Sequence, residues 1–329
     1  MAGPRRHHFV PRFYLERFAK DGSLHVRRRD GRTFTTGAAA IAVRTGFYDV
    51  TLPDGEVSKE VEEWLGGLEG QAAAAMRNID ATGAAPGLDD PDRAVLSLYL
   101  AIQLARTPEQ RERIQFPERV GEFLAGRELT KDLMADYLRD THLGFDPEPS
   151  EVQGAYDFAS YVLAQPDQVT DEMSMQILLS TTQETSPMLL GLHWCIEHDR
   201  KGRFITSDGP LVLWRTPTPR DAFEGFGIGN AEEIRFPLDP TKQLVLTPKP
   251  RPASVRISPQ RVWACNQDLA YACHHFVVAG PSEEARTALL VLPPKRPVMR
   301  FSSGPLYREQ PDGTLVSDGE VLHSWVPRR

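Results

Sequence analysis

The chain has 329 residues, 40% of them hydrophobic and 25% charged, and its formal net charge at pH 7 is −7. This composition is typical of a globular protein, and the length allows one large domain or two smaller ones. Proteins that coat nucleic acid without sequence preference are usually basic, because they neutralise phosphates, so the acidic balance argues against non-specific nucleic-acid binding.

The first predicted elements are a short helix and a hairpin. An apolar stripe runs through residues 7–22 behind Pro11, which suits the first turn of a helix because its missing N–H costs nothing there. Residues 24–35 are centred on Asp30-Gly31, a pair that accepts the positive φ of a tight turn, and are predicted to form a hairpin. Another short strand is expected within residues 40–48. The basic run beside the turn is interpreted as a solvated hairpin tip: Arg27, Arg28 and Arg29.

The middle of the chain is predicted to be helical. Apolar residues recur there at helical spacing, and clusters of Pro, Gly and Asp separate the segments. The predicted helices span residues 58–80, 92–113, 118–125, 130–141, 150–163 and 171–185.

From residue 189 onward, short apolar runs indicate strands, with two helices between them. The predicted strands span residues 190–196, 203–206, 211–214, 234–236, 243–246 and 276–279, and the predicted helices span 258–272 and 282–289. Helices that cluster first and strands that cluster later predict an α+β fold, in which a helical N-terminal and middle region packs on a mostly antiparallel C-terminal sheet.

The domain organisation follows from this order of elements. We expect residues 1–280 to form a single α+β domain, with its helical region at about 57–187 and with the N-terminal hairpin joining the later sheet. Residues 281–329 are expected to form a C-terminal extension with a short helix and strands.

Cysteine usage and hydropathy indicate the compartment. The three cysteines, Cys195, Cys265 and Cys273, are too few and too widely spaced for a disulfide framework or a C-x-x-C zinc site, which favours a reducing environment. No apolar signal core follows the polar N-terminus, and no apolar run approaches the roughly 20 residues that span a bilayer. We therefore expect a cytoplasmic protein without a membrane partner.

Several segments resemble the motifs of one family, the domain-of-unknown-function family 4238. The resemblance runs from about His7 to Ala279 and implies a shared fold and a shared site, but it supplies no activity. Gly209 stands where the family often has Asn. The segments that carry the resemblance are HHFVPRFYL at 7–15 followed by Phe18, YLAIQLARTP at 99–108, FITSDGP at 204–210, FPLDP at 236–240, and the helix that contains Asn266.

His7 and His8 are the first candidate site residues. Imidazole titrates near neutral pH, so the pair suits either a catalytic base or the ligands of a divalent metal. In the alternative, one ring bonds a backbone carbonyl and the other is solvated. A metal site completed by the Cys273-His274-His275 run is a further interpretation.

Gln103 and Arg106 are three residues apart on a predicted helix, which places both on one face. A buried amide and a buried guanidinium need partners, and arginine is well shaped for the carboxylate or phosphate of a small-molecule ligand. An internal partner such as Asp208 would serve equally well.

Ser207 and Asp208 lie where a predicted strand ends, a usual place for functional groups. As catalytic residues, Asp208 would orient a histidine or complete a metal site, and Ser207 would be a nucleophile, although no G-x-S-x-G motif surrounds it. The alternative for Asp208 is a turn in which the carboxylate accepts backbone N–H groups. Asn266 is a candidate substrate-binding residue, with a hydrogen-bonding role in the fold as its alternative.

These residues support two classes of function. The first is a hydrolase-like, metal-dependent enzyme that acts on a phosphate- or carboxylate-bearing substrate. The second is a non-enzymatic binding or interaction module, in which the same residues form a structural polar network. An HNH-like nuclease is a lesser alternative, because His-His-Phe-Val-Pro resembles the first half of that motif but no Asn follows between Pro11 and Asp49.

Overall fold

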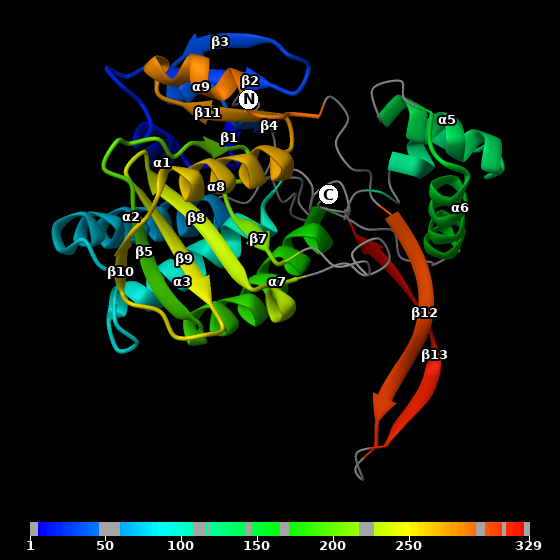
Figure 1. The fold of residues 1–329 in the computed structure, drawn as a ribbon. Helices are drawn as coiled ribbons and strands as arrows, with labels where there is room; N and C mark the ends of the chain where they lie inside the picture. The colour runs from blue at the N-terminus through cyan, green and yellow to red at the C-terminus, as the bar shows by residue number, and fades with distance from the viewer. Residues whose placement is uncertain are drawn as a thin grey trace. The chain divides into compact units, whose positions relative to one another are not determined.

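The computed structural model describes residues 6–45, 60–107, 116, 119–141, 146–164, 171–216, 227–293, 300–310 and 314–325. The chain divides into two compact units. The larger unit comprises residues 1–111, 170–218 and 226–294, and the smaller unit comprises residues 112–169, 219–225 and 295–329 (Figure 1). The domain boundary that the sequence places at residue 280 stays a prediction.

A five-stranded sheet in the order β10-β5-β9-β8-β7 forms the centre of the larger unit. Its antiparallel members are β5 (His193–His198), β9 (Lys242–Thr247), β8 (Glu233–Asp239) and β7 (Val212–Trp214), whereas β10 (Ser254–Arg256) runs parallel to β5. Successive residues of a strand point to opposite faces. Trp194 and Ile196 therefore join the main apolar core, and Cys195 and Glu197 point to the other face.

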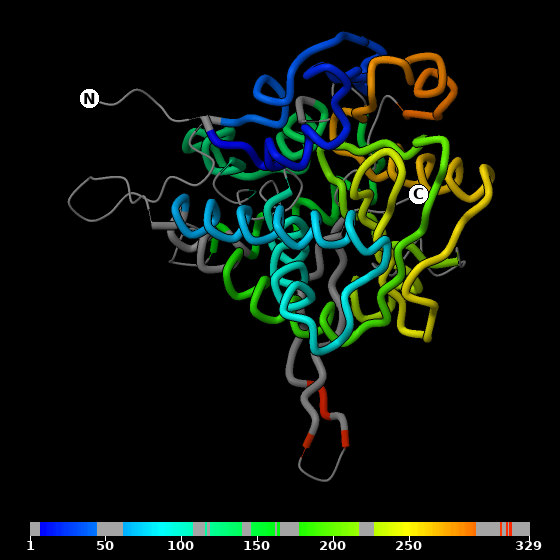
Figure 2. The backbone as a smooth tube through the Cα atoms, turned by 90° about the vertical axis from the view of Figure 1, so that its left-hand side faces the viewer, coloured from blue at the N-terminus to red at the C-terminus, as the bar shows by residue number. Residues whose placement is uncertain are grey.

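Three helices bury their apolar side chains against the core face of this sheet: α2 (Glu60–Thr82), α3 (Pro91–Ala105) and α7 (Asp171–Gly191). α2 and α3 are neighbours (Figure 2). Asp90 caps α3 by accepting the backbone N–H of Asp92, and Pro91 occupies the first helical position. The α+β class that the sequence predicts is confirmed.

α7 is longer than predicted. It continues through Pro187 to Gly191, so the strand predicted from residue 190 begins only at His193. A proline inside a helix removes one hydrogen bond, but the burial of Leu189 in the core offsets that cost.

A second, four-stranded sheet has the order β3-β2-β11-β6 and is antiparallel throughout. It comprises β2 (Leu24–Arg28), β3 (Thr33–Thr36), β6 (Thr206–Ser207) and β11 (Phe276–Ala279). β2 and β3 are the two strands of the predicted hairpin, and Gly31 has the positive φ, 85°, that its turn requires. The N-terminal hairpin thus lies in one sheet with β11, a strand about 250 residues later in the sequence.

The interpretation of the basic run as a solvated tip was wrong for Arg29. Its side chain is buried, and its guanidinium donates to the backbone carbonyls of Tyr271 and Cys273, at 2.7 Å in each case. These carbonyls end α8 (Pro259–Ala272), where the last turn of a helix leaves acceptors without an intrahelical donor. α8 itself begins as predicted, with Ser258 as its cap.

His7 and His8 lie in a strand and not in the helical segment predicted for residues 7–22. β1 (Arg6–His8) pairs with β4 (Val43–Thr45), and the predicted helix is reduced to α1 (Arg12–Glu16). The pairing partner is far away in sequence, so helical periodicity could not reveal it. The remaining short elements of the unit are η1 (Ala38–Ala40), η3 (Ile228–Asn230), η4 (Pro281–Glu283) and α9 (Glu284–Ala288).

The smaller unit contains α5 (Lys131–Thr141), α6 (Pro149–Leu163) and a long hairpin of β12 (Arg300–Glu309) and β13 (Leu315–Trp325). Its own apolar cluster includes Phe116 and Tyr137, whose ring centroids lie 5.8 Å apart. Among the helices that the structure describes in both units, none combines the length and the apolar composition that crossing a bilayer requires.

Candidate functional site

Three polar residues share one face of α3: Tyr99, Gln103 and Arg106. Gln103 follows Tyr99 by four positions and precedes Arg106 by three, and side chains at these spacings lie on the same side of a helix. Tyr99 and Gln103 are 1% exposed and Arg106, the C-cap residue, is 2% exposed. The rest of the buried surface of α3 is largely Leu, Ile and Ala, so this row is a polar line inside an apolar core.

Arg106 connects this row to α2. Its Nη1 donates to Oε1 of Glu69 at 2.9 Å, and the Glu69 side chain is partly exposed. A carboxylate beside the guanidinium stabilises the charge of a side chain that has left solvent. An internal partner of Arg106 is thus Glu69 of the neighbouring helix, whereas the sequence had offered Asp208 as one example of such a partner.

Tyr99 and Gln103 differ from Arg106 in their hydrogen bonding. The hydroxyl of Tyr99 and both amide atoms of Gln103 are buried, and none of these atoms has a hydrogen-bond partner among the described residues. Burial raises the pKa of Tyr99 well above its ordinary value, so the phenol stays neutral. Each unmet group costs about 1–3 kcal/mol, so this face of α3 carries hydrogen-bonding capacity that the fold itself leaves unused.

His7 approaches α2 on the same side as Arg106. Its ring is buried, and Nε2 lies 3.8 Å from Oε2 of Glu62. Glu62 and Glu69 are seven positions apart on α2, which is two helical turns and a rise of about 10 Å. The helix therefore brings His7 and Arg106 to two points along one face, at a spacing that a small molecule can bridge.

His8 faces a different neighbour. Its Nε2 lies 3.4 Å from the carbonyl oxygen of Ala38, and the side chain is half-buried. This contact is the alternative that the sequence suggested for one ring of the pair, namely a bond to a backbone carbonyl.

Asp208 and Ser207 lie at the end of β6. Asp208 is 1% exposed, and its two carboxylate oxygens accept the backbone N–H groups of His274, at 2.7 Å, and of His275. Ser207 Oγ accepts the N–H of Gly209 at 3.2 Å. The contacts of Asp208 therefore match the alternative in which its carboxylate holds backbone groups, and they fix the segment between α8 and β11.

Asn266 also bonds the backbone with both ends of its amide. Its Oδ1 accepts the N–H of Ile205 at 3.2 Å, and its Nδ2 donates to the carbonyl of Arg203 at 2.8 Å. The side chain thereby ties α8 to the segment that enters β6. These bonds are the role in the fold that the sequence offered as the alternative to substrate binding.

Metal-binding residues do not cluster in the part of the chain that the structure describes. No three His, Cys, Asp or Glu side chains there are placed to hold one ion. Cys273 donates its Sγ proton to the carbonyl of Ala270 at 3.2 Å, and the rings of His274 and His275 lie edge to face with centroids 4.2 Å apart. The divalent metal at His7 and His8 stays a prediction, as does the HNH-like alternative.

A buried charge network on the α8 face of the five-stranded sheet was not predicted. Glu197, 1% exposed, accepts hydrogen bonds through Oε1 from Nη2 of Arg251 at 2.8 Å and of Arg261 at 3.1 Å. Arg261 also donates to Glu233 at 2.6 Å, and Arg235 bonds both Glu233 and Asp268. Burial would raise the pKa of Glu233, but Arg235 and Arg261 hold it below its ordinary value.

The network links α8 to the sheet through paired charges. Three guanidinium groups meet three carboxylates, and Arg235 also stacks on the ring of Trp214 at 4.5 Å. The only hint in the sequence was the presence of single charges in apolar strands, Glu197 and Arg235. These ion pairs hold the sheet and α8 together.

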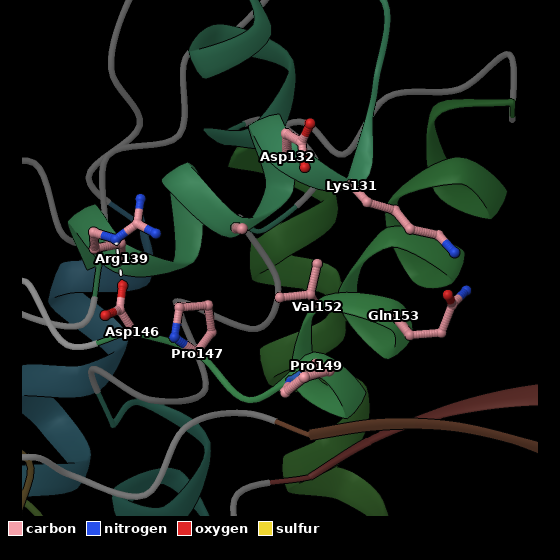
Figure 3. Close-up of a pocket in the computed structure, with 9 residues that line it drawn as sticks. Lys131, Asp132, Arg139, Asp146, Pro147, Pro149, Val152 and Gln153 are labelled. Carbon is pink, nitrogen blue, oxygen red and sulfur yellow. Dashed lines mark hydrogen bonds and ion pairs between the residues drawn. The ribbon is translucent and has the colours of Figure 1, made fainter.

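A hollow of about 520 Å³ lies between α5 and α6 in the smaller unit (Figure 3). Arg139 on its rim bonds Asp146 at 2.8 Å and Asp136 at 2.6 Å. The remaining charges of the lining are one base and one acid, Lys131 and Asp132. This balance gives no preference for a ligand of either sign.

His25 is expected to make the protein less stable in acid. The residue lies on β2, its side chain is buried, and its Nε2 has no hydrogen-bond partner among the described residues. Burial lowers its pKa, Glu284 opposes this shift, and Arg27 adds to it. A depressed folded-state pKa means that stability is lost as the pH falls from about 6.5, the ordinary value, through the folded value, at up to about 1.4 kcal/mol for each pH unit.

The measurement is urea unfolding at pH 7.5 and at pH 5.5, for the wild-type protein and for His25→Leu. The stability difference between the two pH values should shrink in the variant. An equal difference in both proteins would show that other groups cause the acid sensitivity.

Comparison with known proteins places the chain in a family. A model of the family described as "Protein of unknown function (DUF4238)" matches residues 6–283, which include every motif that suggested the resemblance. No curated protein and no solved structure matches the chain.

Proposed function

This chain belongs to the DUF4238 family of proteins of unknown function, and on that premise we propose that it binds a small carboxylate- or phosphate-bearing molecule at the polar face of α3. The observation that supports this is Gln103, whose buried amide has no hydrogen-bond partner among the described residues. Natural proteins satisfy most buried polar groups, and exceptions concentrate at functional sites. A ligand would supply the bonds that the fold does not.

Arg106 determines the charge of the ligand. It is a buried guanidinium three residues from Gln103, and Glu69 bonds one of its nitrogens. A guanidinium has five N–H donors in a planar fork, a shape that suits a carboxylate or a phosphate group. Low solvent exposure strengthens such a charge-assisted bond.

The reaction that best suits this arrangement is hydrolytic, with His7 as the general base. Glu62, 3.8 Å from Nε2 of His7, would stabilise the imidazolium that forms when the ring takes a proton from water. The two-turn spacing of Glu62 and Glu69 on α2 would place the reacting bond within about 10 Å of the anion at Arg106. If His7 takes no part in chemistry, the same site makes the chain a binding module.

We expect sodium propionate or inorganic phosphate to raise the melting temperature of the wild-type protein and not that of Arg106→Met. At ten times its Kd, a ligand stabilises the folded state by about 1.4 kcal/mol. The measurement is thermal unfolding against anion concentration, with sodium chloride at matched ionic strength, because phosphate also stabilises proteins by exclusion from their surface.

Arg139→Met, which removes an exposed arginine from the smaller unit, is the matched control and should keep the full shift. The proposal fails if neither anion shifts the wild-type protein, or if Arg106→Met shifts equally.

A further inference from the structure

The hydrogen-bonding pattern of the α3 face defines the ligand more closely than its charge does. We infer that the ligand carries an amide, ureido or carbamoyl group next to its carboxylate, as N-acylated and N-carbamoylated amino acids do. This inference rests on the function proposed above and adds to it the chemistry of the ligand beside the anion.

The inference is based on Gln103, because neither of its two polar amide atoms has a hydrogen-bond partner among the described residues. Oε1 can only accept hydrogen bonds and Nε2 can only donate them. A carboxylate offers acceptors alone, so it would satisfy Nε2 and leave Oε1 unpaired. The group that meets Gln103 must therefore present an N–H donor and a carbonyl acceptor side by side, and an amide or urea does so with the geometry of a second carboxamide.

Tyr99 likewise calls for a ligand group that can form hydrogen bonds. Its neutral hydroxyl can donate one bond and accept others, and it also has no partner among the described residues. Its ring lies between Phe13 and Phe236, with centroids 6.0 Å away in each case. The polar atoms of Tyr99 and Gln103 are buried, where an unmatched hydrogen bond is costly and selectivity is high.

The positions of Gln103 and Arg106 on α3 indicate how far apart the amide and the carboxylate of the ligand lie. Side chains at positions i and i+3 of a helix have Cβ atoms about 5–6 Å apart. The amide at Gln103 and the anion at Arg106 should therefore be separated by a similar distance. An N-acylated α-amino acid carries its amide and its carboxylate on one short segment, which suits two neighbouring side chains of one helix face.

The test compares N-acetylglycine, N-carbamoylglycine and propionate as ligands of the full-length protein by isothermal titration calorimetry. The two amide-bearing acids should bind at least about tenfold more tightly than propionate, because only they satisfy Oε1 of Gln103. Lactate, which has a hydroxyl in place of the amide, should bind with an affinity between that of propionate and that of the amide-bearing acids.

Gln103→Met is the decisive variant. It should lower the affinity for N-acetylglycine to that for propionate and leave propionate binding unchanged. It should also raise the melting temperature of the free protein, by roughly 2–4 °C, because it removes an unsatisfied amide from the core. Tyr99→Phe, which keeps the ring, should reduce N-acetylglycine affinity several-fold and provides a second reading if Gln103→Met folds poorly.

Gln243→Met is the matched control. Gln243 is as deeply buried, but its Nε2 donates to Glu197 at 3.2 Å and lies 3.3 Å from Sγ of Cys265. Removing an amide that has partners should lower the melting temperature and leave the selectivity between the acids intact.

The outcomes separate the two proposals. Equal affinity for propionate and the amide-bearing acids would overturn the amide assignment and leave the anion site standing. No binding of any of the acids would overturn both. Selectivity that survives in Gln103→Met and in Tyr99→Phe would show that other residues recognise the amide.

Discussion

Replacing Glu197 with glutamine is expected to lower the free energy of unfolding by about 3 kcal/mol, because two arginines then lose the carboxylate that they share. Glu197 is almost fully buried on the α8 face of the sheet and bonds both Arg251 and Arg261. Breaking a buried ion pair costs about 3–5 kcal/mol. The lower end applies here, since each arginine side chain keeps about a quarter of its surface exposed and Arg261 keeps Glu233.

Urea unfolding followed by circular dichroism measures this effect. Glu232→Gln, which changes an exposed carboxylate one position before Glu233, should stay within about 0.5 kcal/mol of the wild-type protein. A similarly small change in Glu197→Gln would mean that the arginines find other partners. Propionate binding at α3 should be the same in both variants, because the charge network lies across the sheet from α3.

The parts of the fold that the sequence predicts correctly have local signals. Ser258 and Pro259 mark the beginning of α8, Asp30-Gly31 marks the turn between β2 and β3, and the continuous apolar run at 276–279 matches β11. Each signal concerns residues that are neighbours in sequence. Hydrogen bonding and steric preference act at that range, so a single sequence is enough to read them.

The parts that the sequence misses depend on distant partners. β1 exists because it pairs with β4, Arg29 is buried because the end of α8 offers it carbonyls, and Glu197 finds its arginines about 54 and 64 positions away. No pattern within a window of a dozen residues contains these contacts.

In the candidate site, too, some features have local sequence signals and others depend on residues that are distant in sequence. The spacing on α3 correctly predicts that Gln103 and Arg106 share a buried face. It cannot say that Arg106 pairs with Glu69, because that depends on how α2 packs beside α3. It also cannot say which polar atoms the completed fold leaves without partners, and those atoms of Gln103 are what point to a ligand.

Asp208→Asn is expected to lower the free energy of unfolding by about 2–3 kcal/mol without changing the affinity for N-acetylglycine. Both carboxylate oxygens of Asp208 accept backbone N–H groups, from His274 and His275. Asparagine offers one acceptor, and its NH₂ group would face the second N–H, so one buried donor is left unsatisfied and the charge-assisted strength of the other bond is lost. Asp89→Asn, at an exposed position, is the control and should be neutral.

The same variant separates the two roles that the sequence allowed for this carboxylate. A catalytic aspartate is usually held at some cost in stability, so its replacement leaves stability unchanged or raises it. An aspartate that organises the backbone between α8 and β11 does the opposite, because its charge is matched to the two N–H groups that it accepts. Unaltered urea unfolding of Asp208→Asn would return Asp208 to the list of catalytic candidates. A clear loss of stability in Asp208→Asn would leave His7, Gln103 and Arg106, beside α2 and α3, as the candidates for the chemistry of the chain.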